Sequence, residues 1–173
     1  MIKKVYTSII DSPLGLINLG ASEKGICLLE FGNEKRIQNH YTQFNKHWDV
    51  ELINKKSNLI EEAEKQLLSY FNKELVDFDL PQDIVGTAFQ LSVWEELLNI
   101  KYGTTRSYKQ QAIALGDIKA IRAVATANGQ NRISIIIPCH RVIGTDGSLT
   151  GYGGELWRKQ KLLELENNQP KLF

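Results

Sequence analysis

The stretch Ile135-Ile136-Ile137-Pro138-Cys139-His140-Arg141-Val142 decides how the second half of this 173-residue chain is interpreted. Residues 133–137 form a short apolar run that predicts a buried strand, and Pro138 ends it because proline offers no N–H to a sheet. The chain then places a thiol beside an imidazole, just before a glycine-rich stretch over residues 144–154. A thiol reacts as its thiolate, and His140 and Arg141 are placed to raise the thiolate fraction of Cys139. This stretch therefore predicts a nucleophilic cysteine that faces a cleft.

Other interpretations of the Cys139–His140 pair are a core cysteine beside a surface histidine, a metal site and a protease site. Two adjacent ligands cannot complete a tetrahedral metal site without two more. A protease is disfavoured because no second histidine lies in a matching sequence context. The position of the pair, between a strand and a glycine-rich stretch, favours the nucleophile over the core cysteine.

The composition is that of a folded protein, with 42% hydrophobic and 24% charged residues. The length fits one ordinary domain or two small ones. Two cysteines, Cys27 and Cys139, exclude a disulfide-stapled scaffold and a four-cysteine zinc site. No signal-peptide pattern opens the chain, and no apolar run approaches the roughly 20 residues that a bilayer requires. We expect a cytoplasmic protein with reduced thiols, in which Cys27 is a small buried apolar side chain.

Positive charge is concentrated in one part of the chain. The formal net charge is only +1, but residues 101–141 carry seven basic side chains against one acidic side chain, Asp117. The seven are Lys101, Arg106, Lys109, Lys119, Arg122, Arg132 and Arg141. Such a local excess attracts a polyanion even when the protein as a whole is nearly neutral, so this stretch favours a nucleic-acid partner.

The N-terminal half predicts antiparallel strands followed by a helix. Runs rich in β-forming residues cover residues 5–10, 14–21 and 25–31, with turn-forming clusters between them. Residues 33–57 show no clear period, and the two histidines within them, His40 and His47, are expected at the surface. A helix is expected to open at Asn58, with Glu61 in the capping position. Its predicted apolar face consists of Ile60, Ala63, Leu67 and Phe71.

The C-terminal half is predicted to be mostly helical. Residues 73–86 have no periodicity and are expected to link the two halves, residues 1–82 and 83–173. Thr87 and Gln90 form a capping-box pair at the start of a helix. The buried stripe expected on this helix consists of Phe89, Val93, Leu97 and Ile100.

Two further helices have the proportions of a helix-turn-helix. A second capping-box pair begins a helix at Ser107, and Asp117 is expected to cap another over residues 118–127, which carries Lys119 and Arg122. Short helices joined by a glycine turn are also common in ordinary cores. The surrounding basic residues favour a nucleic-acid surface over that alternative.

A last helix over residues 156–167 carries Glu166 on the same face as Leu162 and Leu163. A carboxylate beside a buried face can hold a histidine in one tautomer, as the third member of a nucleophile–base–orienter series. From spacing alone, Glu166 is one candidate among several acidic residues.

Taken together, these blocks resemble the O6-alkylguanine-DNA alkyltransferases, also called the methylated-DNA–protein-cysteine methyltransferase family. The resemblance covers residues 86–167 in register. Its blocks are Phe89-Gln90-Leu91-Ser92-Val93-Trp94, Ser107-Tyr108, Arg122-Ala123-Val124, Asn131, Pro138-Cys139-His140-Arg141-Val142 and Gly151-Tyr152-Gly153-Gly154. The Pro-Cys-His-Arg-Val segment at its distance from Arg-Ala-Val is a specific signature.

The resemblance implies a role for each residue of the reacting group. Cys139 would accept the alkyl group, and His140 would act as its base through a water molecule. Glu166, 27 positions after the cysteine, would orient His140. Asn131 would hold the Cys139–His140 turn through side-chain hydrogen bonds.

The resemblance also implies the residues that bind substrate and DNA. Tyr108 would donate a hydrogen bond to guanine N3 and help to rotate the nucleotide outward, and Arg122 would fill the gap in the base stack. Tyr152 and the backbone of Cys139, Val142 and Gly153 would line the guanine pocket. The remaining members of the predicted substrate and DNA contact set are Ser107, Ala123 and Arg141.

Four positions depart from the family's usual pattern. Thr104 stands where an acidic or amide residue is usual, Thr126 where glycine is frequent, and Arg132 where proline is usual. Gly153 is serine in some members, so any contact with guanine O6 at this position must come from its backbone N–H. These departures affect the expected rate and the preference among alkyl groups.

The implied protein is an α+β repair enzyme that transfers an alkyl group once and irreversibly from O6-alkylguanine to Cys139, with O4-alkylthymine as a further candidate substrate. Its N-terminal half would resemble a ribonuclease-H-like antiparallel sheet with helices, and its C-terminal half would carry the helix-turn-helix. It would act as a monomer on double-stranded DNA, in the cytoplasm of a prokaryote, without cofactor, metal or membrane. The alternative is a non-catalytic binder of alkylated DNA, or a helix-turn-helix regulator, on the same fold.

Overall fold

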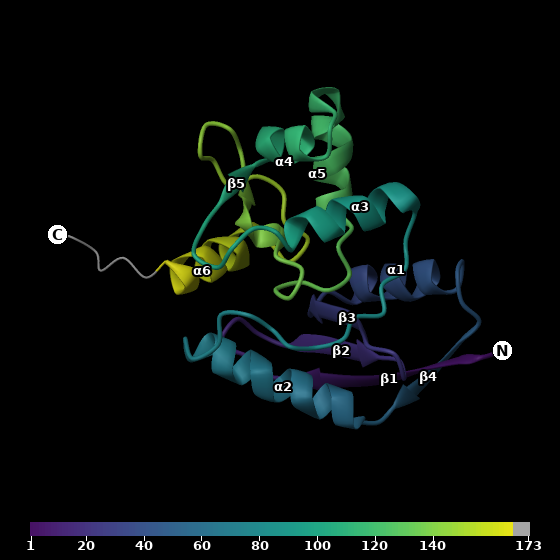
Figure 1. Cartoon of the computed structure of the whole chain (residues 1–173). Coiled ribbons are helices and arrows are strands. Elements are labelled where there is room, and N and C mark those ends of the chain that lie inside the picture. The colour runs from purple at the N-terminus through teal and green to yellow at the C-terminus, as the bar shows by residue number, and fades with distance from the viewer. Residues whose placement is uncertain (168–173) are drawn as a thin grey trace.

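The computed structural model describes residues 1–167, which form a four-stranded sheet and, later in the chain, a group of helices above it (Figure 1). The strands are β1 (Lys3–Ile10), β2 (Ile17–Ala21), β3 (Ile26–Phe31) and β4 (Val50–Asn54), in the order β3-β2-β1-β4. The first three pair antiparallel, as predicted. The fold is thus a mixed α+β fold, with the sheet confined to the first third of the chain.

The expectation of an antiparallel sheet is wrong for β4, which pairs parallel to β1. Helix α1 (Glu34–Phe44) is the reason, because it carries the chain from β3 across the sheet to the far edge. A crossover of this kind lets the returning strand run in the same direction as its neighbour. Asn33 caps α1 by accepting a hydrogen bond from the backbone N–H of Arg36, at 3.0 Å.

His40 corrects a second expectation, since it is buried on α1 rather than exposed. Its Nε2 lies 3.3 Å from the carboxylate of Glu30, a buried residue of β3. Its Nδ1 lies 3.5 Å from the guanidinium of Arg132. His47 is exposed, as expected.

Helix α2 (Asn58–Phe71) packs against β1, β2 and β3 and lies beneath the sheet in Figure 1. The cap is Ser57, whose hydroxyl accepts from the Ile60 N–H, so it stands one residue before the expected position. Ile60, Ala63 and Leu67 are buried as predicted. Tyr70 joins them on the buried face, whereas Phe71 is only half-buried.

The C-terminal elements are mainly helices, as predicted. They are α3 (Ala88–Leu97), β5 (Arg106–Ser107), α4 (Tyr108–Ala114), η1 (Ile118–Ala120), α5 (Ile121–Gly129), η2 (Cys139–Arg141), β6 (Val142–Ile143) and α6 (Leu156–Glu166). Both predicted capping boxes are confirmed, at Thr87–Gln90 and at Ser107–Gln110. The buried stripe on α3 differs from the prediction at Phe89, which is exposed. Trp94 is buried in its place, and its Nε1 donates to the Ala127 carbonyl at 2.8 Å.

The helix-turn-helix consists of α4 and the η1–α5 segment, with Gly116 at φ +90° between them. A left-handed residue at a helix end favours glycine, which has no Cβ to clash. Asp117 caps a 3₁₀ turn, by accepting from the Lys119 N–H at 2.8 Å, before α5 begins. The expected single helix over residues 118–127 is therefore a short 3₁₀ turn followed by an α-helix.

The strand expected over residues 133–137 is not formed. Ile135 has φ +72°, and only one residue of this segment bridges to the sheet, Ile133 to Leu29 of β3. The Leu29 N–H donates to the Arg132 carbonyl at 2.9 Å and the Ser134 N–H donates to the Leu29 carbonyl at 2.8 Å. A short apolar run without a helical or strand period fits a buried turn as well as a strand. Residues 133–137 form such a turn, packed against β3.

One hydrophobic cluster extends through both halves and includes Leu29 of β3, Leu67 of α2, Trp94 of α3 and Leu162 of α6. The two halves therefore share a core. The division at residues 82 and 83 stays a prediction, and residues 168–173 of the predicted second half lie outside the described residues. None of the helices between residues 1 and 167 has the length and apolar character needed to cross a bilayer.

Candidate active site

Cys139 opens the short turn η2 and is 7% exposed. Its Sγ accepts a hydrogen bond from Nδ2 of Asn131, at 3.2 Å. The same amide nitrogen donates to the Ile137 carbonyl at 2.8 Å, and its oxygen accepts from the Ile133 N–H at 3.0 Å. Asn131 thus satisfies the buried backbone of the preceding turn and contacts the sulfur with one side chain.

The environment of the sulfur favours the neutral thiol at rest. Burial raises the pKa of Cys139, while the hydrogen bond from Asn131 and the positive charges of Lys159 and Arg36 act in the opposite direction. Because the net pKa shift is upward, the thiol needs a base at the moment of reaction.

His140 is fully buried beside Cys139, and its Nε2 lies 2.8 Å from Oε1 of Glu166 on α6. Burial alone would raise the pKa of Glu166, but hydrogen bonds and charge from His140 and Arg141 hold it below its usual range. The carboxylate is therefore ionised and can only accept, so Nε2 carries the hydrogen.

The other ring nitrogen of His140, Nδ1, is buried and has no hydrogen-bond partner among residues 1–167. Burial lowers the pKa of His140, against the opposing effect of Glu166, so the ring is neutral. A neutral imidazole with a bare nitrogen is equipped to accept a proton.

Arg141 lies elsewhere than the sequence suggested. Its guanidinium donates to Glu166 from Nε at 2.8 Å and from Nη2 at 2.9 Å, and also to the Ile100 carbonyl at 2.6 Å. It is 7% exposed. The expected role of Arg141 in activating Cys139 and in contacting DNA is thus corrected, because its charge is directed at the buried carboxylate.

Tyr108 begins α4, and its hydroxyl donates to the Thr150 carbonyl at 2.7 Å. Its neighbour Lys159, which no sequence pattern singled out, is fully buried, and its Nζ lies 3.4 Å from the Tyr108 oxygen. Burial lowers the pKa of Lys159 to about 8. A lysine within a charged helix sequence gives no signal that it faces inward, so only the packing reveals it.

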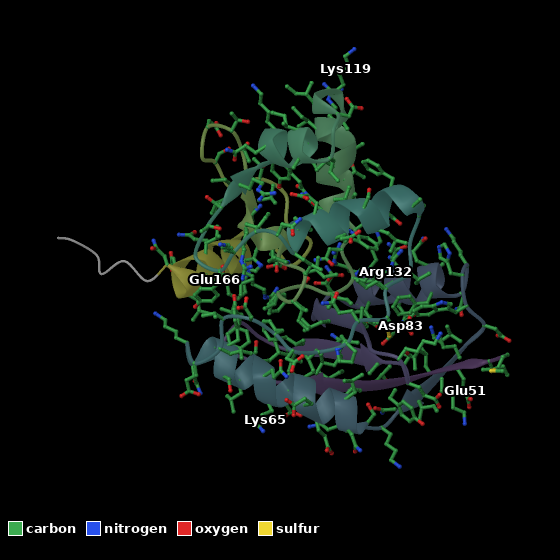
Figure 2. All side chains as sticks on the ribbon, in the orientation of Figure 1. Glu51, Lys65, Asp83, Lys119, Arg132 and Glu166 are labelled. Carbon is green, nitrogen blue, oxygen red and sulfur yellow. The ribbon has the colours of Figure 1, made fainter. Side chains whose placement is uncertain are left out.

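The outer face of the helix-turn-helix carries Arg122 and Ala123, both exposed on α5, while Ser107 is half-buried at the cap of α4. Figure 2 shows Lys119 at the tip of this helix pair and Arg132 beside α1, where it is buried. Of the seven bases, those exposed are Lys101, Lys109, Lys119 and Arg122. Arg106 pairs with Glu96, and Arg132 and Arg141 are buried, so the expected surface charge of the stretch is smaller than its sequence indicates.

The glycine-rich segment contacts the N-terminal half. A Cβ on Gly153 would lie 2.1 Å from Cζ of Arg36, so this α1 side chain occupies the space that a larger residue would need. Arg36 donates to Glu30 at 2.7 Å and to the Asn131 carbonyl at 3.2 Å.

The Tyr152 hydroxyl is buried without a hydrogen-bond partner in the described chain. Val142 is fully buried, and its N–H donates to the Cys139 carbonyl.

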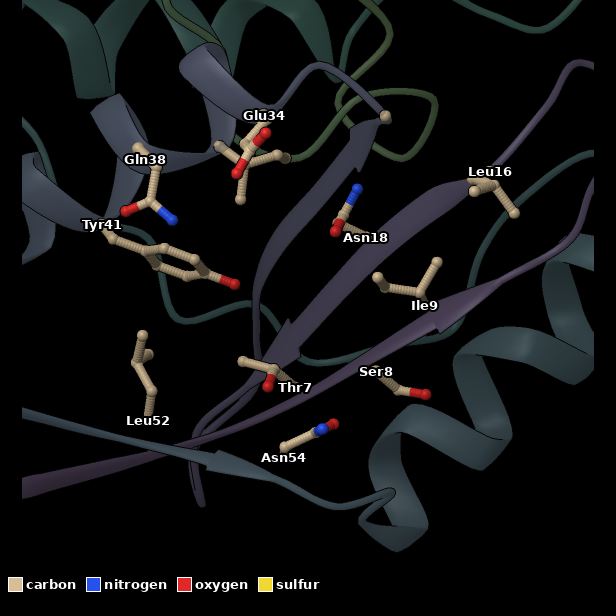
Figure 3. Close-up of a pocket in the computed structure, with 12 residues that line it drawn as sticks. Thr7, Ser8, Ile9, Leu16, Asn18, Glu34, Gln38, Tyr41, Leu52 and Asn54 are labelled. Atoms are coloured by element: carbon tan, nitrogen blue, oxygen red, sulfur yellow. The ribbon is translucent and has the colours of Figure 1, made fainter.

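A pocket of about 580 Å³ lies on the N-terminal half, between α1 and the sheet (Figure 3). Its lining includes Thr7, Asn18 and Tyr41 and none of the predicted site residues. Between residues 1 and 167, no group of three or more His, Cys, Asp and Glu side chains is arranged to hold a metal ion.

Comparison with known proteins shows to which class of protein the chain is similar. Residues 5–84 match the model of the 6-O-methylguanine DNA methyltransferase ribonuclease-like domain, and residues 88–168 match that of the DNA binding domain of the same methyltransferases. A DNA-binding methyltransferase of two parts is thus the class that the fold and the sequence share.

Individual relatives agree with this class. A methylated-DNA–protein-cysteine methyltransferase of Methanosarcina barkeri is 47% identical over 165 residues, which are 95% of this chain and 98% of that protein. One of Mycobacterium bovis is 42% identical over 95% of this chain and 94% of its own length. The crystal structure of Mycobacterium tuberculosis OGT in complex with DNA matches with a TM-score of 0.76 and 42% identity, over 95% of this chain and 92% of that one. The chain belongs to the 6-O-methylguanine DNA methyltransferase family.

Proposed function

We propose that this protein repairs double-stranded DNA by transferring the alkyl group of O6-alkylguanine to the sulfur of Cys139. The observation that carries the proposal is the arrangement of four neighbouring side chains, those of Asn131, Cys139, His140 and Glu166. The buried sulfur is held by Asn131 at 3.2 Å, and the adjacent His140 is held by Glu166 at 2.8 Å. The family membership of the chain agrees with this reaction.

The transfer is a displacement at the alkyl carbon. The thiol proton of Cys139 passes through a water molecule to Nδ1 of His140, the one ring nitrogen that is free to accept it. The sulfur–carbon bond then forms while the bond from that carbon to guanine O6 breaks. Guanine leaves as an anion, and the Tyr108 hydroxyl stabilises it by donating at N3. The product is a thioether, so each molecule reacts once.

The target atom lies inside the duplex, and the nucleotide must leave the base stack before it can react. We assign this step to Arg122, which is exposed on α5 and can fill the space left by the base. Unstacking costs a few kcal/mol, and less for an alkylated base that pairs badly. Tyr152, Val142 and the backbone N–H of Gly153 would line the pocket that receives the guanine.

The setting of the reaction follows from its chemistry. A reduced thiol is needed, and the cytoplasm maintains thiols in that form. Cys27 and Cys139 are both unpaired in the structure. We propose a cytoplasmic monomer of a prokaryotic cell, acting on nucleoid DNA without a cofactor.

The test is the intact mass of the protein after incubation with a duplex that contains O6-methylguanine. A gain of one methyl group, located on the peptide that contains Cys139, is expected. An unchanged mass with retained binding to the duplex would instead support a non-catalytic binder of alkylated DNA. A preference for one DNA sequence, together with dimerisation, would support a regulator.

A further inference from the structure

The carboxylate of Glu166 receives a hydrogen bond from a part of the chain that the proposed reaction does not use. The Tyr70 hydroxyl donates to Oε1 of Glu166 at 2.7 Å, and Tyr70 belongs to α2, in the N-terminal half. His140 donates to this same oxygen at 2.8 Å and Arg141 does so at 2.9 Å. Oε1 therefore accepts three hydrogen bonds, one of which comes from the N-terminal half.

The position of the phenol is fixed by packing. Tyr70 is fully buried, and its ring contacts those of Phe71, Phe78 and Tyr102, with centroids 5.5, 5.4 and 6.1 Å away. Burial and the nearby charge of Glu166 raise the pKa of Tyr70 far above its usual range. The hydroxyl thus stays protonated and can only act as a donor toward the carboxylate.

We propose that Tyr70 is a positioning residue of the transfer reaction, because its hydrogen bond to Oε1 of Glu166 sets how strongly that carboxylate supports His140 as a base. This inference rests on the proposed function. A second donor to the same oxygen draws electron density from that oxygen and so weakens the hydrogen bond that it accepts from the His140 N–H. Without the phenol, Glu166 would attract the proton on His140 more strongly, and the imidazolium form would be favoured.

Several charged or titratable groups face His140, and each must be held constant in the test. Glu166 and Lys159 come from α6, and Arg141 and Cys139 are its neighbours in η2. Tyr102, which follows α3, contacts Arg141 with its ring, 5.8 Å from the guanidinium. Tyr70 is the group from α2, and replacing it leaves the others in place.

The test compares Tyr70→Phe with Tyr102→Phe in the full chain. Tyr102 lies in the same aromatic cluster, but its hydroxyl donates to the Leu165 carbonyl at 3.5 Å. In Tyr70→Phe, we expect NMR titration to show a higher pKa for His140, by about half a pH unit, equivalent to about a threefold change in proton affinity. The acid limb of the single-turnover rate should move to higher pH by the same amount. Tyr102→Phe should move neither.

A second variant tests the direction of the effect and covers a folding failure of Tyr70→Phe. Site-specific 3-fluorotyrosine at position 70 keeps the hydroxyl and makes it a stronger donor, so both midpoints should move to lower pH. Unchanged midpoints, or shifts in the same direction in both variants, would overturn the inference. A uniform loss of rate with fixed midpoints would mean that Tyr70 only supports the fold.

The NMR titration needs no alkyl transfer, which separates the two possible failures. Should the wild-type protein accept no methyl group while the His140 midpoint responds to Tyr70, the proposed function fails. Should the wild type react normally while the midpoints ignore both variants, only the inference about Tyr70 fails.

Discussion

The side-chain amide of Asn131 lies 3.2 Å from the sulfur of Cys139, eight residues further along the chain. The same nitrogen donates to the Ile137 carbonyl, while the amide oxygen accepts from the Ile133 N–H. The turn that carries the cysteine is thus built around one side chain. Stability and reactivity are coupled at this position, because a single substitution removes both sets of contacts.

Asn131→Ala should therefore lower both the free energy of unfolding and the transfer rate. A buried backbone group left without a partner costs about 1–3 kcal/mol. The Ile133 N–H would be such a group, whereas the Ile137 carbonyl would still accept from the Cys139 N–H at 2.8 Å. Asn131→Asp is the informative comparison. It keeps an acceptor for Ile133 but loses the donor and adds negative charge near the sulfur, so the pKa of Cys139 should rise further. Urea unfolding and thiol alkylation against pH measure the two effects. A full transfer rate in Asn131→Asp would contradict the assignment.

Cys139→Ser should abolish alkyl transfer and preserve duplex binding, because a hydroxyl is a much weaker nucleophile and is nearly isosteric. The matched control is Cys27→Ser. Cys27 is 1% exposed, and burial raises its pKa to about 12, so its thiol should be unreactive. The measurement is the intact mass after incubation with methylated duplex. A methyl group on the Cys139→Ser protein would make Cys27 the acceptor.

Arg122→Ala should impair repair of duplex DNA much more than reaction with free O6-benzylguanine. Its proposed action is to replace the extruded base, and a free base needs no extrusion. The decisive quantity is the ratio of the two single-turnover rates. Equal loss of both rates would show that Arg122 supports the fold or the cysteine instead.

Lys119→Ala is the control for Arg122→Ala, because it removes the same single positive charge from the same face. Lys119 is exposed at the neighbouring 3₁₀ turn. Loss of one phosphate contact should weaken duplex binding and reduce the salt dependence of the affinity by about one unit of log–log slope. The rate at saturating DNA should stay near that of the wild type. A drop in this rate as large as in Arg122→Ala would remove the distinction between binding and base extrusion.

Gly153→Ala should destabilise the contact between the two halves, by about 1–3 kcal/mol, because the new Cβ would overlap Arg36. The side chain of Arg36 would have to move away from Glu30 and the Asn131 carbonyl. In an Arg36→Ala background, the same glycine substitution should cost less than about 0.5 kcal/mol, which a double-mutant cycle measures. Gly129→Ala in α5, whose new Cβ would meet open space, is the control without overlap and should not destabilise the protein. Additive costs in the cycle would exclude the overlap.

Stability should decline below pH 6.5 through His40. Burial lowers its pKa from the usual 6.5, with Glu30 acting against this shift and Arg36 and Arg132 acting with it. The unfolded chain therefore binds a proton first as the pH falls, and the stability present above pH 6.5 is lost, by at most about 1.4 kcal/mol per pH unit for one site.

His40→Gln should reduce this decline, and the exposed His47→Gln should leave it unchanged. The pKa of His140 is also lowered by burial, so part of the slope should persist in both variants. Urea unfolding at pH 8, 6 and 5 gives the slopes. An equal slope in His40→Gln and the wild type would contradict the buried, neutral state of His40.

The sequence by itself determined the features that depend on residues close together in the chain. The capping boxes at Thr87 and Ser107 join residues three apart, and each of the first three strands is a continuous run rich in β-forming residues. The adjacency of Cys139 and His140 is covalent. Local hydrogen bonds and short sequence patterns specify such features without contacts from distant parts of the chain. They can therefore be predicted from the sequence alone.

Only the tertiary structure decided which distant groups meet. Tyr70 and Glu166 are separated by 96 positions, and Arg36 and the Asn131 carbonyl by 95. Arg132, Arg141 and Lys159 carry charges that predict exposure, yet all three are buried against groups from other elements. A buried charge persists only where packing supplies its partners. The partners of Arg132 come from both halves, and those of Arg141 and Lys159 come from other elements of the C-terminal half, so no local pattern specifies them.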